Sequence, residues 1–394
     1  MGFSMKIMFY AKAPDATKHY RVDIPVKYLN RSPGVIAHVE YAEKLQIAPG
    51  SQGFRAEDLK DTDIVVLQRP VTPGVEQMID FIHKNYPKIP VVCDYDDDYF
   101  SVPRWNPGYP HLKMFEKYWR KIVEKMDGAI CSTEPLSDMI RKHSKKTDEI
   151  VTIGNGFDFE AFDTLTPVEG PPMIAPSPEH TDKIIPLYNL EVSQFNELTK
   201  NKTVCAWAGS KFHYVDLDWI PESIRKVSEE TDDIVFLFIG YMQGNLVKAS
   251  KINHMFLSKG APGVLNFYRM LMGLNIDIML APLDPNTFNR SKSNLKLVES
   301  MALGAYPICS AWDPYELDLE DDDEEMDQVH GRLVDYQPYE WARAIMEVSD
   351  KIKNAEYKKK YRSENNAYLR CTHDAELRTE KYLAYFNQMI DRKK

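Results

Sequence analysis

Short apolar runs, many of them β-branched, recur along the first part of the chain and predict the strands of a sheet. They cover Lys6–Ala11, Val35–Val39, Asp63–Leu67, Pro90–Asp94, Gly128–Cys131 and Glu149–Ile153. Between several of them, apolar residues recur with the three-to-four spacing of a helix, as in Val75–Lys84, Lys113–Met126 and Glu134–His143. Strands that alternate with helices are typical of a parallel sheet with helices on both faces.

The alternation stops where prolines become dense, between Leu165 and Pro186, which predicts a linker or an excursion loop. It then resumes and predicts a second Rossmann-like unit. The strands expected there are Thr203–Ala208, Ile234–Ile239, Ile276–Ala281, Tyr306–Ser310 and Arg332–Asp335.

The last part of the chain, Pro338–Arg392, is charged, aromatic and poor in glycine and proline, which suits two or three consecutive helices. A chain of 394 residues also exceeds the usual size of one hydrophobic core. We therefore predict an N-terminal domain, a linker, a C-terminal domain and a helix that crosses back to the first domain. The expected boundaries are 1–165, 166–200, 201–372 and 373–394.

The composition and net charge argue against several classes of protein. Hydrophobic residues make up 43% and charged residues 27%, which is the balance of a globular protein. The formal net charge of -10 argues against nonspecific binding of polyanions such as DNA. No stretch approaches the ~20 apolar residues of a membrane span, and the N-terminus lacks a signal peptide, so we expect a cytoplasmic protein without stable membrane insertion. Five widely spaced cysteines without a CxxC pair predict buried free thiols.

The richest candidate site follows the predicted strand Asp277–Ala281, in the text DIMLAPLDPNTFNRSKSNLKLVESMALGAYPICS. Ligands of open α/β sheets sit at the carboxyl ends of the strands. A helix that opens with Ser291, Lys292 and Ser293 offers backbone N–H groups, hydroxyls and a cation to a diphosphate. Lys296 and Glu299 share one face of this helix, and Glu299 is placed to accept hydrogen bonds from a ribose. The alternative is a capped surface helix with an ion pair.

This segment resembles the donor-binding segment of GT-B glycosyltransferases, especially the large retaining family four. The resemblance implies two Rossmann-like domains that face each other across a cleft, with C-terminal helices. It also implies that Glu299, in the context ESMALGAYPICS, binds the nucleotide ribose. The loop before the helix, with Asn289, Arg290 and Ser291–Ser293, is then expected to hold the diphosphate and sugar.

A second resemblance lies in AGSKFHYVDL, which is similar to the GSxxHxxDL stretch of one branch of these enzymes. It adds Gly209, Ser210, Lys211 and His213 to the expected donor site. Lys211 stands where the family commonly places a cation for the pyrophosphate, and a glycine lets backbone approach a phosphate closely.

The first domain carries weaker matches. KHYRVDIPVKYL resembles the YRxxxPxxxL element of the same branch, and Arg21 in it is expected to meet phosphate or acceptor unless it forms a structural ion pair. CSTEPLSDMI and VTIGNGFDFEAF resemble the STExL and PNGxD stretches.

An acidic run, CDYDDDYFSVP, follows the strand Pro90–Asp94. Close carboxylates raise one another's pKa values, so Asp97 or Asp98 is a candidate to accept a proton from the acceptor hydroxyl. A metal-binding DxD of the GT-A type and a solvated acidic turn are the alternatives.

Two features depart from the family pattern. Many members carry a pair of glutamates eight residues apart, and the first of these positions is Ser291 here, which leaves retention of anomeric configuration open. The loop after the first strand, AKAPDATKHYR, also lacks the glycines that would let its backbone approach a ligand.

The sequence thus predicts a hexosyl- or pentosyltransferase that takes a sugar from a UDP- or GDP-sugar, with retention and without metal or cofactor. A glycan, a lipid-linked saccharide, a protein and a modified DNA base remain open as acceptors. A nucleotide-sugar epimerase of the same fold and a noncatalytic nucleotide-sugar-binding protein are the alternatives. An NAD dehydrogenase is disfavoured because no GxGxxG follows a predicted strand.

Overall fold

The computed structural model describes residues 4–41, 59–171, 173–176, 187–241, 255–319 and 330–394. The chain divides into two compact units. The first unit runs to Phe159 and takes in Arg290–Ser293 and Thr372–Lys394, and the second unit holds Glu160–Asn289 and Asn294–Cys371. The predicted crossing helix therefore corresponds to a segment that is part of the first unit.

The first unit is built on a six-stranded parallel sheet in the order β2-β1-β3-β4-β5-β6. β3, β4 and β5 have every residue buried, as expected for parallel strands covered on both faces. The strand bounds are β1 Met5–Ala11, β2 Val35–Tyr41, β3 Ile64–Gln68, β4 Val91–Tyr95, β5 Gly128–Cys131 and β6 Ile150–Thr152.

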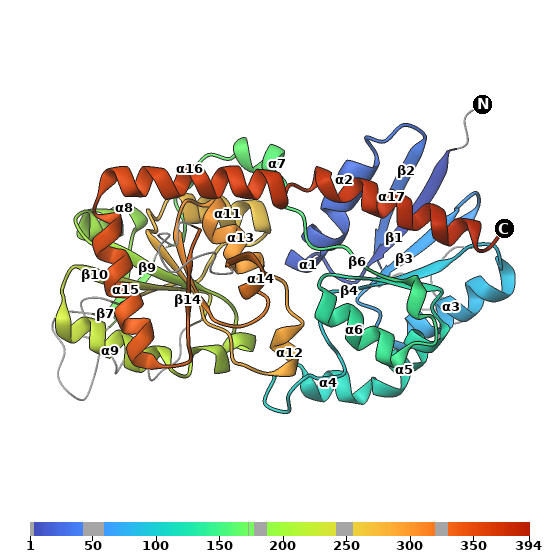
Figure 1. The fold of residues 1–394 in the computed structure, drawn as a ribbon, viewed down its shortest axis with the longest axis horizontal. Coiled ribbons are helices and arrows are strands. Elements are labelled where there is room, and N and C mark those ends of the chain that lie inside the picture. The colour runs from blue at the N-terminus through green and yellow to red at the C-terminus, as the bar shows by residue number, and fades with distance from the viewer. Residues whose placement is uncertain (1–3, 42–58, 172, 177–186, 242–254, 320–329) are drawn as a thin grey trace. The chain divides into compact units, whose positions relative to one another are not determined.

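Two apolar cores cover the two faces of this sheet, and Figure 1 shows the helices that bring them. One core joins the sheet to α3 (Pro73–Asn85), α5 (Glu116–Lys125) and α6 (Glu134–His143). The other joins it to α2 (Ile24–Leu29) and α17 (Glu376–Asp391). The remaining helical segments of the described chain in this unit are α1 (Ala16–Lys18), the π-helix His19–Asp23, α4 (Tyr109–Met114) and the 3-10 turn Thr147–Glu149, and α7 (Phe159–Asp163) begins at its boundary with the second unit.

The α17 helix is fitted closely to the sheet. Tyr385 on α17 donates a hydrogen bond to the carbonyl of Glu149 at 2.6 Å. A Cβ atom on Gly128, the first residue of β5, would lie 2.3 Å from the Tyr385 hydroxyl. Glycine at this position therefore makes room for the helix.

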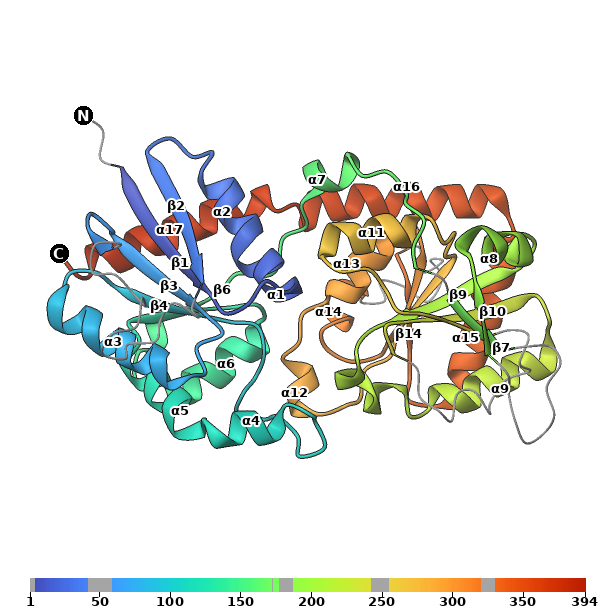
Figure 2. The ribbon, with the colours of Figure 1, turned by 180° about the vertical axis from the view of Figure 1, so that it is seen from behind.

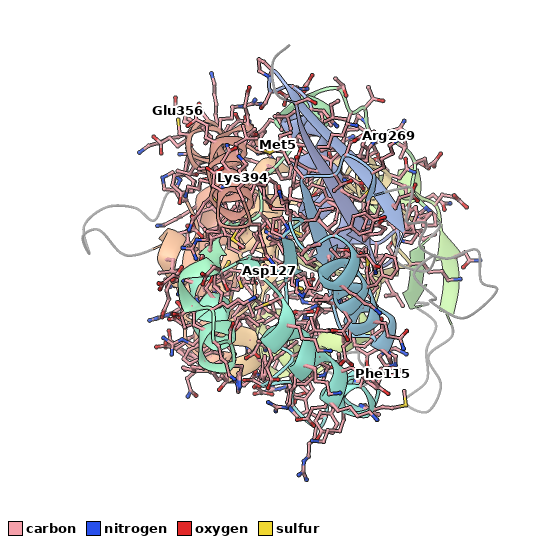
Figure 3. The ribbon with its side chains drawn as sticks, turned by 90° about the vertical axis from the view of Figure 1, so that its right-hand side faces the viewer. Met5, Phe115, Asp127, Arg269, Glu356 and Lys394 are labelled. Atoms are coloured by element: carbon pink, nitrogen blue, oxygen red, sulfur yellow. The ribbon has the colours of Figure 1, made fainter. Side chains whose placement is uncertain are left out.

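The amino edge of the same sheet is held by Asp127, labelled in Figure 3. This buried carboxylate accepts hydrogen bonds from His83 Nε2 and from the backbone N–H of Val91, both at 2.9 Å. It also pairs with the ammonium groups of Lys146 and Lys393, at 3.2 and 2.8 Å. Burial would raise the pKa of Asp127, but these donors, led by His83, hold it well below its ordinary value.

The second unit contains an eight-stranded sheet in the order β14-β13-β12-β9-β10-β11-β7-β8. Its strands are parallel except that β7 runs antiparallel to both β11 and β8. The bounds are β7 Met173–Pro176, β8 Leu187–Leu190, β9 Thr203–Ala208, β10 Ile234–Ile239, β11 Met255–Ser258, β12 Ile278–Ala281, β13 Tyr306–Ser310 and β14 Arg332–Val334.

Helices cover both faces of this sheet as well (Figure 2). α9 (Ile220–Glu230) and α15 (Pro338–Ile352) contribute to one core, and α8 (Val192–Thr199) and α11 (Val264–Met272) contribute to the other. The other helical segments described are the 3-10 turns Lys211–His213 and Val215–Leu217, and α12 (Thr287–Arg290), α13 (Leu295–Ala302), α14 (Glu316–Leu319) and α16 (Ala355–Thr372).

The segment predicted as a linker, 166–200, differs from the expectation. Its described part contains β7, β8 and α8, so it adds two strands and a helix to the second unit. A proline also ends the first of these short strands, since Pro176 is the last residue of β7. The cysteine prediction also needs one correction, because Cys371 is exposed whereas the other four cysteines are buried.

Candidate functional site

Each sheet has one place where the strand order reverses, and ligands of open α/β sheets bind outside the carboxyl ends of the strands at such a point. In the second unit, β9 is followed by β10 and β11 on one side and by β12 on the other, so the reversal falls between β9 and β12. In the first unit it falls between β1 and β3.

Three glycines stand at the carboxyl ends of adjacent strands in the second unit: Gly209 after β9, Gly240 after β10 and Gly260 after β11. Gly240 and Gly260 have φ values of +90° and +76°, which L-residues with side chains rarely adopt. A Cβ on Gly209 would lie 2.6 Å from the ring of Trp207, and one on Gly240 would lie 2.5 Å from the Gly209 carbonyl oxygen. Backbone conformation and close packing therefore require glycine at these positions.

A cavity of about 450 Å³ opens at these glycines. Its volume lies within the roughly 300–1,000 Å³ of small-molecule sites. Two lysines and a hydroxyl supply donors for an anion, and two aromatic rings supply flat apolar surface. The lining residues are Gly209, Ser210, Lys211, Ile239, Gly240, Tyr241, Lys259, Gly260, Ala261 and Phe267. The structure thus brings three predicted donor-site residues, Gly209, Ser210 and Lys211, into one cavity.

The segment after β9 is shaped by its own polar residues. The Ser210 hydroxyl accepts a hydrogen bond from the backbone N–H of Phe212 at 3.3 Å and so caps the 3-10 turn Lys211–His213. His213 Nδ1 then lies 2.8 Å from Oδ2 of Asp216.

Asp216 connects this segment to the loop that follows β12. Its Oδ1 accepts hydrogen bonds from the backbone N–H of Asp284 and from the Asn289 side chain, both at 2.9 Å. Asp216 and Asn289 are 2% and 1% exposed. Two predicted residues, His213 and Asn289, are therefore joined through a carboxylate that the sequence analysis did not select, although it stands only three positions after His213.

The α13 helix carries two further predicted residues. Glu299 accepts a hydrogen bond from the hydroxyl of Tyr268 at 2.9 Å, and Tyr268 follows Phe267, which lines the cavity. The ammonium of Lys296 lies 4.9 Å from the centroid of the Trp207 ring on β9. Glu299 is thus held on the α11 side of this edge.

The start of α13 differs from the prediction. The helix begins at Leu295 with Asn294 as its N-cap, whereas the sequence predicted an opening from Ser291 to Ser293. The Asn294 side chain donates instead to Asp318. Arg290–Ser293 group with the first unit, where the Thr133 hydroxyl donates to the carbonyl of Ser291 at 2.8 Å and Lys292 lies 3.6 Å from Asp97. The described second unit therefore does not place these residues in its cavity.

The carboxyl edge of the first sheet is filled by ion pairs. Arg69 follows β3 with a φ of +51°, which is uncommon for a residue with a side chain. Its guanidinium lies 3.0 Å from Asp15, 3.4 Å from Asp96 and 3.6 Å from Asp97. Burial raises the pKa of Asp96 to about 6, although Arg69 opposes the rise. Arg69 and Asp15 were missed by the sequence analysis, because neither belongs to a motif.

The predicted residues Arg21 and Asp98 have structural contacts. Arg21 is 1% exposed and donates to both oxygens of Asp94, at 3.0 and 2.6 Å, and to the carbonyl of Ile153 at 2.7 Å. Arg21 therefore forms the structural ion pair that was the alternative to a contact with phosphate or acceptor. Asp98 is fully buried, and one of its oxygens accepts from the backbone N–H groups of Phe100 and Ser101, which closes a local turn. Burial raises the pKa of Asp98.

Two absences concern the described residues only. Among residues 4–41, 59–171, 173–176, 187–241, 255–319 and 330–394, no group of three or more His, Cys, Asp or Glu side chains is arranged to hold a metal ion. Within the same part of the chain, no helix combines the length and apolar character needed to cross a bilayer.

The architecture is that of the GT-B fold, two Rossmann-like domains each built on a mainly parallel sheet. A glycosyltransferase from Rickettsia africae ESF-5 matches with a TM-score of 0.63 and 14% identity, covering 98% of this chain and 99% of its own. Anabaena Alr3699/HepE in complex with UDP and glucose matches with a TM-score of 0.63 and 12% identity, covering 98% and 100%. A putative UDP-N-acetylglucosamine 2-epimerase from Listeria monocytogenes reaches 0.54 and 12%, covering 99% and 97%. The sequence matches no protein-family model and no curated protein sequence.

Proposed function

We propose that this chain is a glycosyltransferase whose second unit binds a nucleotide sugar, most closely related in mechanism to the retaining GT-B enzymes of family four. The observation that carries the proposal is the glycine-edged cavity with Ser210 and Lys211 at the carboxyl ends of β9, β10 and β11. Similar folds that bind UDP or UDP-glucose support a nucleotide-sugar ligand, with UDP preferred over GDP.

The cavity and a carboxylate on the neighbouring helix α13 offer groups to the diphosphate and the ribose of such a donor. Gly209 and Gly240 bring no side chain to the cavity wall, and Lys211 and Ser210 supply a cation and a hydroxyl to a diphosphate. Glu299 offers carboxylate oxygens to ribose hydroxyls, and its contact with Tyr268 fixes its side chain on the α11 side.

Electrostatic stabilisation of the departing diphosphate would drive the transfer of the sugar. When the bond between sugar and phosphate breaks, charge develops on the diphosphate, and fixed donors such as Lys211 stabilise it. This chemistry requires no metal or cofactor. The acceptor is a hydroxyl-bearing molecule, and Asp97, half-buried in the first unit, is the candidate to receive its proton.

A ligand panel tests the donor site directly. At a concentration one hundred times its dissociation constant, UDP stabilises the protein by roughly 2.7 kcal/mol, which is read as a rise in melting temperature. Lys211→Ala and Glu299→Ala are expected to reduce this rise. Lys200→Ala, which removes an exposed lysine at the end of α8, is the matched control. Wild-type protein that shows no shift with UDP, GDP or their sugars contradicts the proposal.

The epimerase deserves a separate test, because one similar fold carries that description. A transferase slowly releases free nucleoside diphosphate from UDP-glucose by hydrolysis, and it leaves UDP-N-acetylglucosamine unepimerised. An epimerase instead converts the N-acetyl sugar at C2, and a binding protein without activity yields neither product. Chromatography of the reaction mixtures separates the three outcomes.

A further inference from the structure

We propose that Lys259 is a specificity-determining residue: its ammonium donates a hydrogen bond to O4 of a uracil ring and so selects UDP-sugars over CDP-sugars. The inference rests on the proposed function and deepens it, because it names the group of the base that the cavity reads. Lys259 directly follows β11 and belongs to none of the motifs in the sequence.

The two ends of the cavity differ in their chemistry. Ser210 and Lys211, which follow β9, bring a hydroxyl and an ammonium, whereas Ile239, Ala261 and Phe267 bring apolar surface beyond β10. Because β10 lies between β9 and β11, two strand spacings, about 10 Å, separate the carboxyl ends of β9 and β11. A nucleoside diphosphate is polarised in the same way, since a ribose separates its anionic tail from its flat ring. We therefore expect the ring at the β11 end.

The apolar surface at this end is gathered around Gly260. A Cβ atom on Gly260 would lie 3.7 Å from a methyl carbon of Ile239 and 3.8 Å from the ring of Phe267. These three residues therefore meet in one part of the cavity wall. Bases stack on aromatic side chains whatever their identity, so this surface can hold a base but cannot distinguish one base from another.

The backbone around Lys259 is held by the residue before it. Ser258, the last residue of β11, is 1% exposed. Its hydroxyl accepts a hydrogen bond from the N–H of Gly260 at 3.3 Å, and its carbonyl accepts one from the N–H of Gly240 at 2.8 Å. Lys259 thus stands in a turn that is tied to the end of β10, and it lines the cavity next to the apolar surface.

Lys259 supplies the discrimination that the apolar surface lacks. In the parts of the chain that the structure describes, its ammonium forms no hydrogen bond and no ion pair. An ammonium can only donate. Uracil carries a carbonyl oxygen at C4, which accepts, whereas cytosine carries an amino group there, which donates. C4 lies on the side of the ring away from the ribose, so its substituent is the one that meets a lysine at the far end of the cavity.

The expected discrimination is moderate. Cytosine sets a second donor against the ammonium, but its N3 atom can still accept a hydrogen bond. We therefore expect UDP to bind about tenfold more tightly than CDP, which is the size of one hydrogen bond to a charged group.

A lysine that only added positive charge to the cavity would behave differently. Its loss would weaken UDP, CDP and inorganic pyrophosphate alike, which is the result expected for Lys211. A lysine that reads the base leaves pyrophosphate unaffected, and its loss removes the preference for UDP over CDP.

Calorimetry on the full chain with UDP, CDP and inorganic pyrophosphate separates these roles. Lys259→Met keeps the apolar stem and removes the ammonium. It is expected to weaken UDP about tenfold, to bring UDP and CDP to similar dissociation constants and to leave pyrophosphate unchanged. Lys211→Met should weaken all three ligands by a similar factor. Lys200→Met, which changes an exposed lysine at the end of α8, should alter none of them.

A change in the ligand checks the same contact without relying on the variant alone. UDP with sulfur in place of O4 offers a weaker acceptor, so it should bind wild type more weakly than UDP does. Lys259→Met should bind the two ligands equally, and the four affinities form a double-mutant cycle that isolates the contact.

The outcomes also separate this inference from the proposed function. Equal affinity of wild type for UDP and CDP, or equal weakening of UDP, CDP and pyrophosphate by Lys259→Met, overturns the role of Lys259 and leaves the donor site in place. Binding of GDP without binding of UDP has the same consequence. If wild-type protein binds none of UDP, CDP and GDP, the proposed function fails, and the inference fails with it.

Discussion

The two sheets present opposite kinds of carboxyl edge. In the first unit, Arg69 is surrounded by Asp15, Asp96 and Asp97, and Arg21 is locked to Asp94. In the second unit, glycines follow three adjacent strands and a cavity opens beside them. Both edges contain a reversal of strand order, so topology alone does not distinguish them.

The difference teaches that side-chain volume and internal neutralisation decide which edge is open to a ligand. Where charged side chains satisfy one another, the edge is stable and largely occupied. Where glycines stand instead, no side chain fills the edge, and the ammonium groups of Lys211 and Lys259 line the cavity that remains. Four changes test this contrast, in order of decreasing expected effect.

Removing the buried ion pair at the carboxyl edge of the first sheet should lower the free energy of unfolding more than any other change. Arg21→Met leaves Asp94 as a buried carboxylate without its cation and is expected to lower the free energy of unfolding by about 3–5 kcal/mol. Urea unfolding of the full chain measures it. Arg120→Met removes an exposed pair with Glu116 and should cost less than about 1 kcal/mol. Similar costs for both variants would show that the buried pair is not a structural anchor.

At the amino edge of the same sheet, Asp127 is expected to make a contribution to stability that depends on pH. Asp127→Asn removes a carboxylate with several charged donors and should lower the free energy of unfolding at pH 7 by roughly 1.5–3 kcal/mol. The pKa of Asp127 is depressed in the folded state, so its contribution is present above about pH 4 and is lost as the pH falls through the folded pKa. Unfolding curves at several acidic pH values should therefore converge for wild type and variant. A constant difference at all pH values contradicts this origin.

Adding a side chain at the carboxyl edge of the second sheet should abolish ligand binding, and it should cost less stability than the changes in the first sheet. Gly240→Ala places a Cβ 2.5 Å from the Gly209 carbonyl at a φ of +90°, and should cost about 1–3 kcal/mol and eliminate the UDP-induced rise in melting temperature. Gly263→Ala is the matched control, because its φ is +79° but its Cβ would meet no atom within 4 Å. That variant should be strained yet still bind UDP.

The smallest expected effect is a change in the pKa of Asp96 at the carboxyl edge of the first sheet. Arg69→Met removes the cation nearest Asp96, so the pKa of Asp96, about 6 in the wild type, should move higher. Carbon-13 spectra of the carboxyl groups follow this midpoint. Arg141→Met, which removes an arginine paired with Glu134 and Asp138, should leave it in place.

The regular part of the fold was predictable because its signal is local. The strands of the first sheet and most of the second coincide closely with the apolar runs, since parallel strands buried on both faces are apolar throughout. β7 and β8 were missed because they lie among prolines that otherwise mark loops, and β11, with the sequence MFLS, was missed because it contains no β-branched residue.

The site was less predictable because its contacts are distant in sequence. Asp216 and Asn289 are 73 positions apart. Arg69 pairs with Asp15, which precedes it in the sequence, and with Asp96, which follows it, and no motif connects these residues. Gly240 and Gly260 each follow a strand singly, and a lone glycine carries little information until neighbouring strands are aligned. Motif resemblance identified Gly209, Ser210 and Lys211, which do line one cavity.

The return of α17 to the first sheet has a consequence for how the protein is made on the ribosome. Tyr382, Tyr385, Phe386 and Met389 complete one of the two cores of the first unit, yet they are translated after the whole of the second unit. One face of the first sheet, with Ile7 and Phe9 on it, is therefore covered only in part, by α2, while more than half of the chain is synthesised. During that interval the nascent first unit is expected to be a client for chaperones that recognise apolar surface, and its folding should finish only after translation of Met389.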